Sequence, residues 1–234
     1  MSDTTEVKRA LGTHAVDRFV QDGMRLGLGT GSTAILAVRR VAERIAEGSL
    51  RKVRAVTTSL QTELEARNLG IPVVTLNDAA LGCELDLTID GADEVDPARN
   101  LIKGGGGALL KEKIVAYASQ RLLIVVDGEK LSERLCERFT VPVEVVADAL
   151  ATVTRRIEAM GGKATLRIGV KKAGPVVTDL GNLLLDVAFP QAFDPPAMED
   201  ALKCIPGVLE NGLFTKKTPE LLIGYPDGRM EYRE

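Results

Sequence analysis

Residues 86–112 read DLTIDGADEVDPARNLIKGGGGALLKE, and the rest of the chain is organised around this stretch. An apolar run ends abruptly at the carboxylates of Asp90 and Asp93. Lys103 follows, then four consecutive glycines, and then a predicted helix that carries Glu112 near its start. Ordered glycine is costly in backbone entropy, so we infer that the backbone here comes close to a small polar ligand. The stretch therefore indicates a site.

The composition is that of an ordinary globular protein. The chain has 234 residues, of which 45% are hydrophobic and 27% charged, enough for one large domain or two small ones. A net charge of −3 without a basic cluster argues against a nucleic-acid partner. No apolar run reaches the roughly 18 residues that cross a bilayer. The polar residues 1–6 predict no secretory signal, and three scattered cysteines predict reduced thiols and a cytoplasmic location.

A metal site is not expected. The chain has a single histidine, His14, which we place on a helix surface, and no cysteines at zinc-ligand spacing. The acidic residues 90–96 would suit a magnesium ion or form a solvated loop, but Lys103 can supply the local positive charge instead. Acid–base chemistry must therefore run on carboxylates, lysines or hydroxyls.

Strands and helices alternate through the first part of the chain. We predict strands at 24–29, 53–56, 71–76, 85–89 and 122–126, and helices at 5–22, 60–69 and 108–119, with a further helix that Ser32 caps and Gly48 ends. This alternation predicts an α/β fold with a parallel, doubly wound sheet. Ligands bind such sheets beyond the carboxyl ends of the strands. Residues 29–33, 57–59, 90–93 and 127–130 are all predicted to lie there.

From about residue 137 the pattern changes to a smaller α+β unit. We expect strands at 139–146, 164–168 and 183–187, and helices at 149–160 and 196–204. Residues 221–225 and 229–232 flank the turn sequence Pro-Asp-Gly and predict a hairpin that rejoins the main sheet. The expected domains are therefore 1–136 with 207–234, and 137–206.

Residues 29–34 read GTGSTA after a predicted strand, a loose match to the dinucleotide fingerprint. A dinucleotide site also needs an acidic residue at the end of the second strand to bind the ribose hydroxyls. Residues 57–59 read TTS at that position. The loop still offers hydroxyls and a helix N-terminus to an anion, so the phosphate of a small molecule fits better than a pyrophosphate.

Lys103 and its glycines do not form a Walker A loop, in which the lysine follows the last glycine. Taken alone, they could form a flexible surface turn. Glu112 could likewise be a first-turn glutamate that favours the helix dipole. A carboxylate kept ionised by that dipole and a lysine can also act as a general base, although the same environment lowers its basicity. Both readings stay open on these residues alone.

Four motifs resemble ribose-5-phosphate isomerases of the A type in order and spacing. They are residues 29–33 (GTGST), 90–94 (DGADE), 103–106 (KGGG) and Glu112, and residues 57–59, 181–186, 205–208 and 212–214 also fit. The resemblance covers essentially the whole chain. It implies a Rossmann-like main domain, a smaller ferredoxin-like domain, a homodimer or dimer of dimers, a sugar phosphate substrate and no cofactor.

The resemblance also implies roles for single residues. Glu112 would be the base that moves the proton between C1 and C2, Asp90 and Asp93 would help to open the furanose ring, and Lys103 would lie beside the enediolate. Further substrate contacts are implied for Gly91, Ala92, Gly104, Gly105 and Gly106. The 5-phosphate would be held by Thr30, Gly31, Ser32 and Thr33, with Lys8 as an additional phosphate contact. Lys130 would be a further lysine that contacts the substrate.

Three functions are compatible with this pattern. The first is interconversion of ribose 5-phosphate and ribulose 5-phosphate, which the motifs favour. The second is a sugar-phosphate sensor without catalysis, which would need a partner-binding or DNA-binding segment that the sequence does not reveal. The third is a coenzyme-A transferase, whose glutamate would form a thioester. We expect neither a nucleic-acid partner nor a membrane partner.

Overall fold

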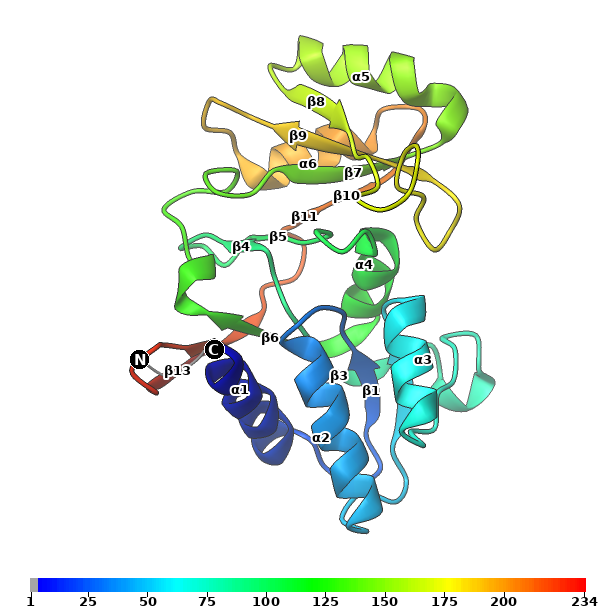
Figure 1. Cartoon of the computed structure of the whole chain (residues 1–234), viewed down its shortest axis with the longest axis vertical. Coiled ribbons are helices and arrows are strands. Elements are labelled where there is room, and N and C mark those ends of the chain that lie inside the picture. The colour runs from blue at the N-terminus through cyan, green and yellow to red at the C-terminus, as the bar shows by residue number, and fades with distance from the viewer. Residues whose placement is uncertain (1–3) are drawn as a thin grey trace. The chain divides into compact units, whose positions relative to one another are not determined.

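The computed structural model describes residues 4–234, which divide into two compact units (Figure 1). Unit one contains residues 4–91 together with Lys111–Glu129 and Pro219–Glu234. Unit two contains Ala92–Leu110 and Lys130–Thr218. Each unit has its own sheet and its own apolar core.

Unit one is built on a six-stranded sheet in the order β13-β12-β6-β3-β1-β2. The strands are β1 (Arg25–Leu28), β2 (Arg54–Thr57), β3 (Leu85–Asp90), β6 (Ser119–Asp127), β12 (Glu220–Gly224) and β13 (Met230–Arg233). All pairs are parallel except β12 with β13, which form the expected hairpin. The prediction of a mainly parallel α/β sheet, with the C-terminus in it, is confirmed.

Helices pack on both faces of this sheet. They are α1 (Thr4–Phe19), α2 (Ala34–Ala46), α3 (Leu60–Asn68) and α4 (Leu109–Tyr117), with short 3₁₀ turns η1 (Ala79–Leu81) and η2 (Gly128–Lys130). Helices α1 and α2 lie side by side in Figure 1, and Leu11 and Val38 share a buried cluster with Leu26 of β1. Val115 of α4 belongs to a separate cluster with Leu85. The sheet is therefore doubly wound.

The strand predicted at residues 71–76 is wrong. One isolated parallel bridge joins Val73 to Ala55, in which Ala55 donates its N–H to Pro72 O at 2.9 Å and Val74 donates to Ala55 O at 2.9 Å. Pro72 has no N–H, so this segment cannot continue a ladder on both sides. The apolar residues instead lie along the edge of the sheet.

Unit two contains a four-stranded antiparallel sheet in the order β10-β7-β9-β8. The chain runs through β7 (Val141–Val145), η3 (Ala147–Ala149), α5 (Leu150–Ala159), β8 (Lys163–Leu166), β9 (Leu183–Ala188), α6 (Pro195–Lys203) and β10 (Val208–Asn211). This β-α-β-β-α-β succession is the ferredoxin-like arrangement. Its core includes Val143, Ile157 and Leu202.

A three-stranded antiparallel sheet also belongs to unit two. It consists of β4 (Glu94–Val95), β5 (Leu101–Ile102) and β11 (Leu213–Phe214), in the order β11-β5-β4. Residues 92–110, 130–136 and 207–218 therefore lie in unit two, whereas the expected domains placed them with the main sheet. The reason is that β10 continues the sheet of β7, and β11 pairs with β5.

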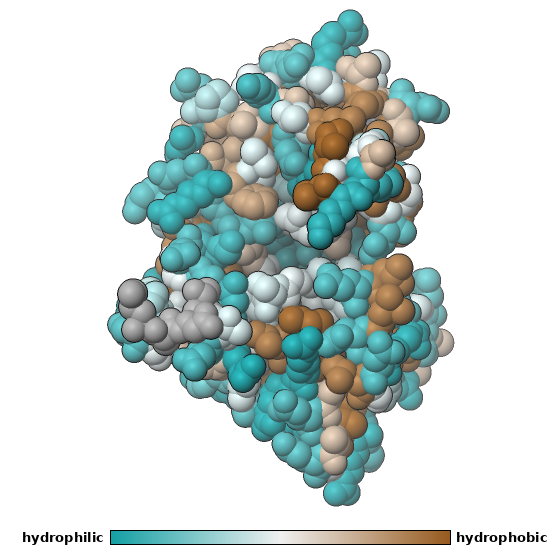
Figure 2. All heavy atoms as spheres, in the orientation of Figure 1, coloured by the Kyte–Doolittle hydropathy of each residue, from teal (hydrophilic) through white to brown (hydrophobic). Residues whose placement is uncertain are grey.

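Several apolar side chains remain exposed. Leu60 and Leu64 of α3 are 52% and 55% exposed, and Val170 in the β8–β9 connection is 99% exposed. Figure 2 shows apolar atoms over both places. Among residues 4–234, no helix combines the length and the apolar character that spanning a bilayer requires.

Arg25 and Asp86 form an ion pair at the amino-terminal edge of the main sheet. Nη2 of Arg25 donates to Asp86 Oδ1 at 2.6 Å, and the backbone N–H of Arg25 donates to Oδ2 at 2.7 Å. The hydrogen bond from the Arg25 side chain lowers the pKa of Asp86 below its ordinary value of 3.8. A lowered carboxyl pKa contributes stability above the ordinary pKa, and this contribution is lost as the pH falls through the lowered value.

We therefore expect Asp86→Asn to lower the free energy of unfolding at pH 7 by about 1.5–3 kcal/mol, the range for hydrogen bonds to charged groups. The difference from the wild type should shrink as the pH falls from 3.8 through the lowered pKa of folded Asp86, because the wild-type carboxylate is progressively protonated and its ion pair is lost. Urea unfolding across this pH range measures it. Glu47→Gln, at an exposed ion pair with Arg40, should change little. A gap between Asp86→Asn and wild type that is independent of pH would contradict the assignment.

Candidate active site

Two of the predicted site segments meet where the strand order of unit one reverses. β1 lies between β2 and β3. After β1 the chain continues to β2 on one side, and after β3 it continues to strands on the other side. Residues 29–33 follow β1, and Asp90 is the last residue of β3. A reversal of this kind is the usual ligand site of an open parallel sheet.

Asp90 is fully buried, and backbone amides hold its carboxylate. Oδ1 accepts the N–H of Thr30 at 3.1 Å and the N–H of Gly91 at 2.8 Å. Gly29 makes this approach possible. A Cβ at residue 29 would lie 2.2 Å from Oδ1 and 2.6 Å from the Cα of Asp90. The glycine of the first motif and the aspartate of the second therefore fit each other.

A cluster of hydroxyl groups surrounds the side chain of Thr30. Its Oγ1 lies 2.7 Å from Oγ1 of Thr58 and donates to Oγ of Ser59 at 2.7 Å. Ser59 donates to Thr62, and Thr62 donates to the carbonyl of Gly29 at 3.0 Å. Thr58 and Ser59, in the segment predicted at a strand end, thus contact the first loop. Thr62 was missed, although its place three residues after the helix-capping Ser59 is a recognisable signal.

The sequence predicted that Ser32 caps α2, and this prediction is wrong. The N-cap residue is Thr33, whose side chain makes no capping hydrogen bond. The hydroxyl of Ser32 instead accepts a hydrogen bond from Nζ of Lys8 at 3.2 Å. Gly31 has φ +111°, which suits glycine. The structure therefore brings a lysine to the loop that begins α2.

Glu112 lies in the first turn of α4 and is only 4% exposed. The amino-terminal end of a helix favours a negative charge, so the backbone supports the ionised carboxylate. Lys111, the preceding residue, lies 3.9 Å from Glu63 of α3. A buried carboxylate on a rigid helix has the fixed position that a general base requires.

Asp93 and Lys103 are close together within unit two. The N–H of Asp93 donates to Ile102 O at 2.8 Å, which continues the pairing of β4 with β5. Oδ2 of Asp93 accepts the N–H of Gly105 at 2.7 Å. Lys103 is 2% exposed, and its Nζ lies 5.6 Å from the ring centroid of Phe214. The acidic motif and the lysine–glycine motif are therefore hydrogen-bonded to each other.

The glycine loop has a fixed shape. Gly104 and Gly107 have φ +102° and +83°, where side chains are strained. A Cβ on Gly104 would lie 2.8 Å from Cβ of Leu109, and Gly107 N–H donates to Gly104 O at 2.9 Å. The loop therefore has a defined conformation that depends on glycine at residues 104 and 107.

Two other acidic residues have buried carboxylate oxygens, and no role was predicted for them. Glu94 is 1% exposed, and its carboxylate accepts the N–H groups of Cys136, Glu137 and Arg138. It anchors the segment that follows η2. Asp127, the last residue of β6, has a buried Oδ1 to which no residue in the described chain donates. Its position at the end of a strand was the available signal.

The predicted site residues are divided between the units. Unit one contains Lys8, Thr30, Gly31, Ser32, Thr33, Asp90, Gly91 and Glu112, and unit two contains Ala92, Asp93, Lys103, Gly104, Gly105, Gly106 and Lys130. Within unit one the structure joins Lys8 to Ser32 and Thr30 to Asp90. Within unit two it joins Asp93 to the glycine loop.

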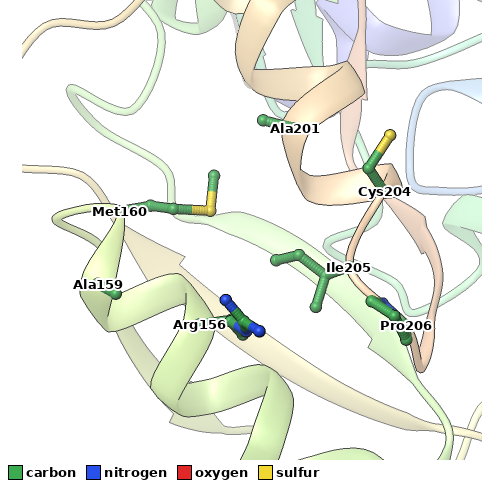
Figure 3. Close-up of a pocket in the computed structure, with 7 residues that line it drawn as sticks. All are labelled: Arg156, Ala159, Met160, Ala201, Cys204, Ile205 and Pro206. Carbon is green, nitrogen blue, oxygen red and sulfur yellow. The ribbon is translucent and has the colours of Figure 1, made fainter.

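A hollow of about 380 Å³ in unit two lies elsewhere (Figure 3). It is lined by residues of α5 and α6 and of the segments that follow them, with Arg156, Met160 and Cys204 among them. None of the predicted site residues lines it. In the part of the chain that the structure describes, no group of three or more His, Cys, Asp or Glu side chains is arranged to hold a metal ion.

Comparison with known proteins agrees with the motifs. Residues 54–228 match the family model described as ribose 5-phosphate isomerase A (phosphoriboisomerase A). A protein from Treponema denticola named ribose-5-phosphate isomerase A is 48% identical and aligns over 98% of this chain and 99% of its own length. One from Thermosynechococcus vestitus is also 48% identical, over 100% of this chain and 99% of its own.

Solved structures are similar over the whole chain as well. Ribose 5-phosphate isomerase A from Methanocaldococcus jannaschii has a TM-score of 0.91 at 40% identity and covers 99% of this chain and 100% of its own. A D-ribose-5-phosphate isomerase in complex with phospho-erythronic acid has a TM-score of 0.93 at 38% identity, with the same coverage.

The fit between Gly29 and Asp90 leads to a test by substitution. Gly29→Ala places a methyl group against the Asp90 backbone, so β1 and β3 must shift, and we expect a loss of about 1–3 kcal/mol in the free energy of unfolding. Gly91→Ala is the matched control, because its added Cβ would meet nothing closer than Val125 O at 3.9 Å. Chemical denaturation compares the two. Equal stability of both variants would show that the close approach is not constraining.

Proposed function

The chain belongs to the ribose 5-phosphate isomerase A family, and on this premise we propose that it interconverts D-ribose 5-phosphate and D-ribulose 5-phosphate. It is thus an aldose–ketose isomerase of the non-oxidative pentose phosphate pathway. One observation in this structure carries the proposal: a buried, amide-bound Asp90 beside a phosphate-suited loop at the strand reversal. A relative bound to phospho-erythronic acid, a phosphorylated acid with a hydroxylated chain, supports a sugar phosphate as the ligand class.

The proposed phosphate anchor is the loop before α2. Thr30, Gly31, Ser32 and Thr33 lie at the start of this helix, where backbone N–H groups and the helix dipole favour an anion. Lys8 supports this proposal because its Nζ already contacts Ser32. The amide and hydroxyl of Thr30 are engaged with Asp90 and the hydroxyl cluster, so Thr30 contributes chiefly by shaping the loop. Lys130 is proposed as a further cation for the substrate.

Glu112 is proposed as the base. It removes the proton from C2 of the open-chain aldose, which gives a 1,2-enediolate, and return of the proton to C1 gives the ketose. The buried position of the carboxylate in the first turn of α4 supports this role, because it gives the base a fixed place. General base catalysis of this kind contributes about 10²–10⁴-fold in rate.

The other groups handle oxygen atoms. Asp90 and Asp93 are proposed to assist ring opening by moving hydroxyl protons. Lys103 and the amides of residues 104–106 are proposed to stabilise the negative charge of the enediolate, with Gly91 and Ala92 as further contacts. Preorganised donors are worth about 10²–10³-fold in such reactions. The chemistry of the proposal uses the chain's own side chains and amides, without a metal or a cofactor.

The proposal includes assembly and location. We infer a homodimer or a dimer of dimers in the cytoplasm. Exposed Ile168, Val170 and Val177 on the β8–β9 connection support assembly, because apolar side chains gathered on a surface mark contact sites. Light scattering should give a mass of two or four times 25.0 kDa at assay concentrations. A monomer mass would contradict this part of the proposal.

We expect Glu112→Gln to lower kcat by about 10²–10⁴-fold, because the amide cannot accept the proton. Calorimetric binding of ribose 5-phosphate should survive, since the side chain keeps its shape. Glu63→Gln on neighbouring α3 is the matched control and should retain activity. The assay is run with a chelator, and activity that requires added metal would contradict the metal-free mechanism. Normal turnover of Glu112→Gln would eliminate this residue as the base.

A further inference from the structure

Arg167, directly after β8, donates hydrogen bonds to the glycine loop of unit two. Nη1 donates to the carbonyl of Gly104 at 3.1 Å and to that of Gly105 at 3.0 Å. On its other side the guanidinium is bound to Asp186 of β9, with Nε donating to Oδ2 at 2.9 Å and Nη2 donating to Oδ1. One side chain therefore links the loop to the four-stranded sheet.

Arg167 is itself held firmly. Its N–H donates to Leu184 O at 2.9 Å, and its carbonyl accepts the N–H of Val176 at 2.9 Å. Asp186 is paired within the sheet with Thr165 and Pro142. The side chain of Arg167 is only 16% exposed. The guanidinium of Arg167 thus projects from backbone that is fixed within the sheet. Because the guanidinium is planar, its N–H donors keep fixed directions relative to one another.

The loop is consequently fixed on both sides. Asp93 accepts the N–H of Gly105, while Arg167 binds the carbonyls of Gly104 and Gly105. Glycine backbones have wide conformational freedom, so these contacts are what select one shape for the loop. The carboxylate of Asp186 balances the charge of Arg167. The arginine therefore acts on the loop mainly through geometry.

We propose that Arg167, oriented by Asp186, is a positioning residue for isomerisation: it sets the direction of the loop amides and of the adjoining Lys103 toward the developing enediolate. The proposal rests on the function proposed above. It assigns no contact between Arg167 and the substrate. If the hydrogen bonds of the Arg167 guanidinium are lost, the chemical step should slow while ground-state binding of the substrate stays largely intact.

The test is Arg167→Lys, which keeps the positive charge but cannot bind Asp186 and two carbonyls together. We expect kcat to fall by about 10- to 100-fold, as for a reacting group displaced by about 1 Å, with KM within about twofold of the wild type. In Arg167→Ala, guanidinium ion at a sub-denaturing concentration should restore part of kcat. Asp186→Asn, which weakens the binding of the Arg167 guanidinium, should also lower kcat.

Arg25→Lys is the matched control. Arg25 likewise binds an aspartate on a neighbouring strand, Asp86, and a backbone carbonyl, that of Leu81 in η1, at 2.7 Å. It lies in unit one, at the amino-terminal edge of the sheet. It should lose thermal stability without losing kcat.

Three outcomes would overturn the proposal: a normal kcat in Arg167→Lys, a change in KM alone, or an equal fall in kcat in Arg25→Lys. If Arg167→Lys fails to fold, the kcat of Asp186→Asn decides, and a normal value overturns the proposal. An inactive wild type would instead refute the proposed function, so the two failures are distinguishable.

Discussion

The close approach of β1 to β3 at their carboxyl ends is the constraint on which unit one depends. Gly29 leaves room for the carboxylate of Asp90, and the amides of Thr30 and Gly91 then bind that carboxylate in a fully buried position. A buried polar group is tolerated when hydrogen bonds satisfy it. The same contact turns the chain into the loop that begins α2. A single interaction thus sets both the acidic group and the anion-binding end of the helix.

Unit two solves a related problem by different means. Four glycines supply the backbone freedom that the loop needs, and that freedom is then removed by Asp93 on one side and Arg167 on the other. Lys103 is anchored through the N–H that it donates to Gly212 O at 2.9 Å. Both units therefore present reactive groups on backbone that has been fixed in advance, and such preorganisation is the main source of electrostatic catalysis.

Much of this could be predicted from sequence because it is local. Strand and helix periodicity gave the parallel sheet, and placing the polar segments at strand ends led to residues 29–33 and Asp90. Other features were inaccessible because they depend on distant residues. Lys8, 24 positions away, takes the hydroxyl of Ser32 that was expected to cap α2. Arg167 lies 62 positions from Gly105, and the pairing of β10 with β7 moved the boundary between the units.

The central claim is that the carboxylate of Glu112 transfers a proton between C2 and C1 of the sugar, with an enediolate as the intermediate. The most direct measurement is the isomerisation of ribose 5-phosphate in D₂O, followed by NMR through many turnovers. The account predicts that deuterium enters C1 of ribulose 5-phosphate and, on reversal, C2 of ribose 5-phosphate, because the base exchanges its proton with solvent. Complete conversion with no deuterium at either carbon would indicate direct hydride transfer and would contradict the account.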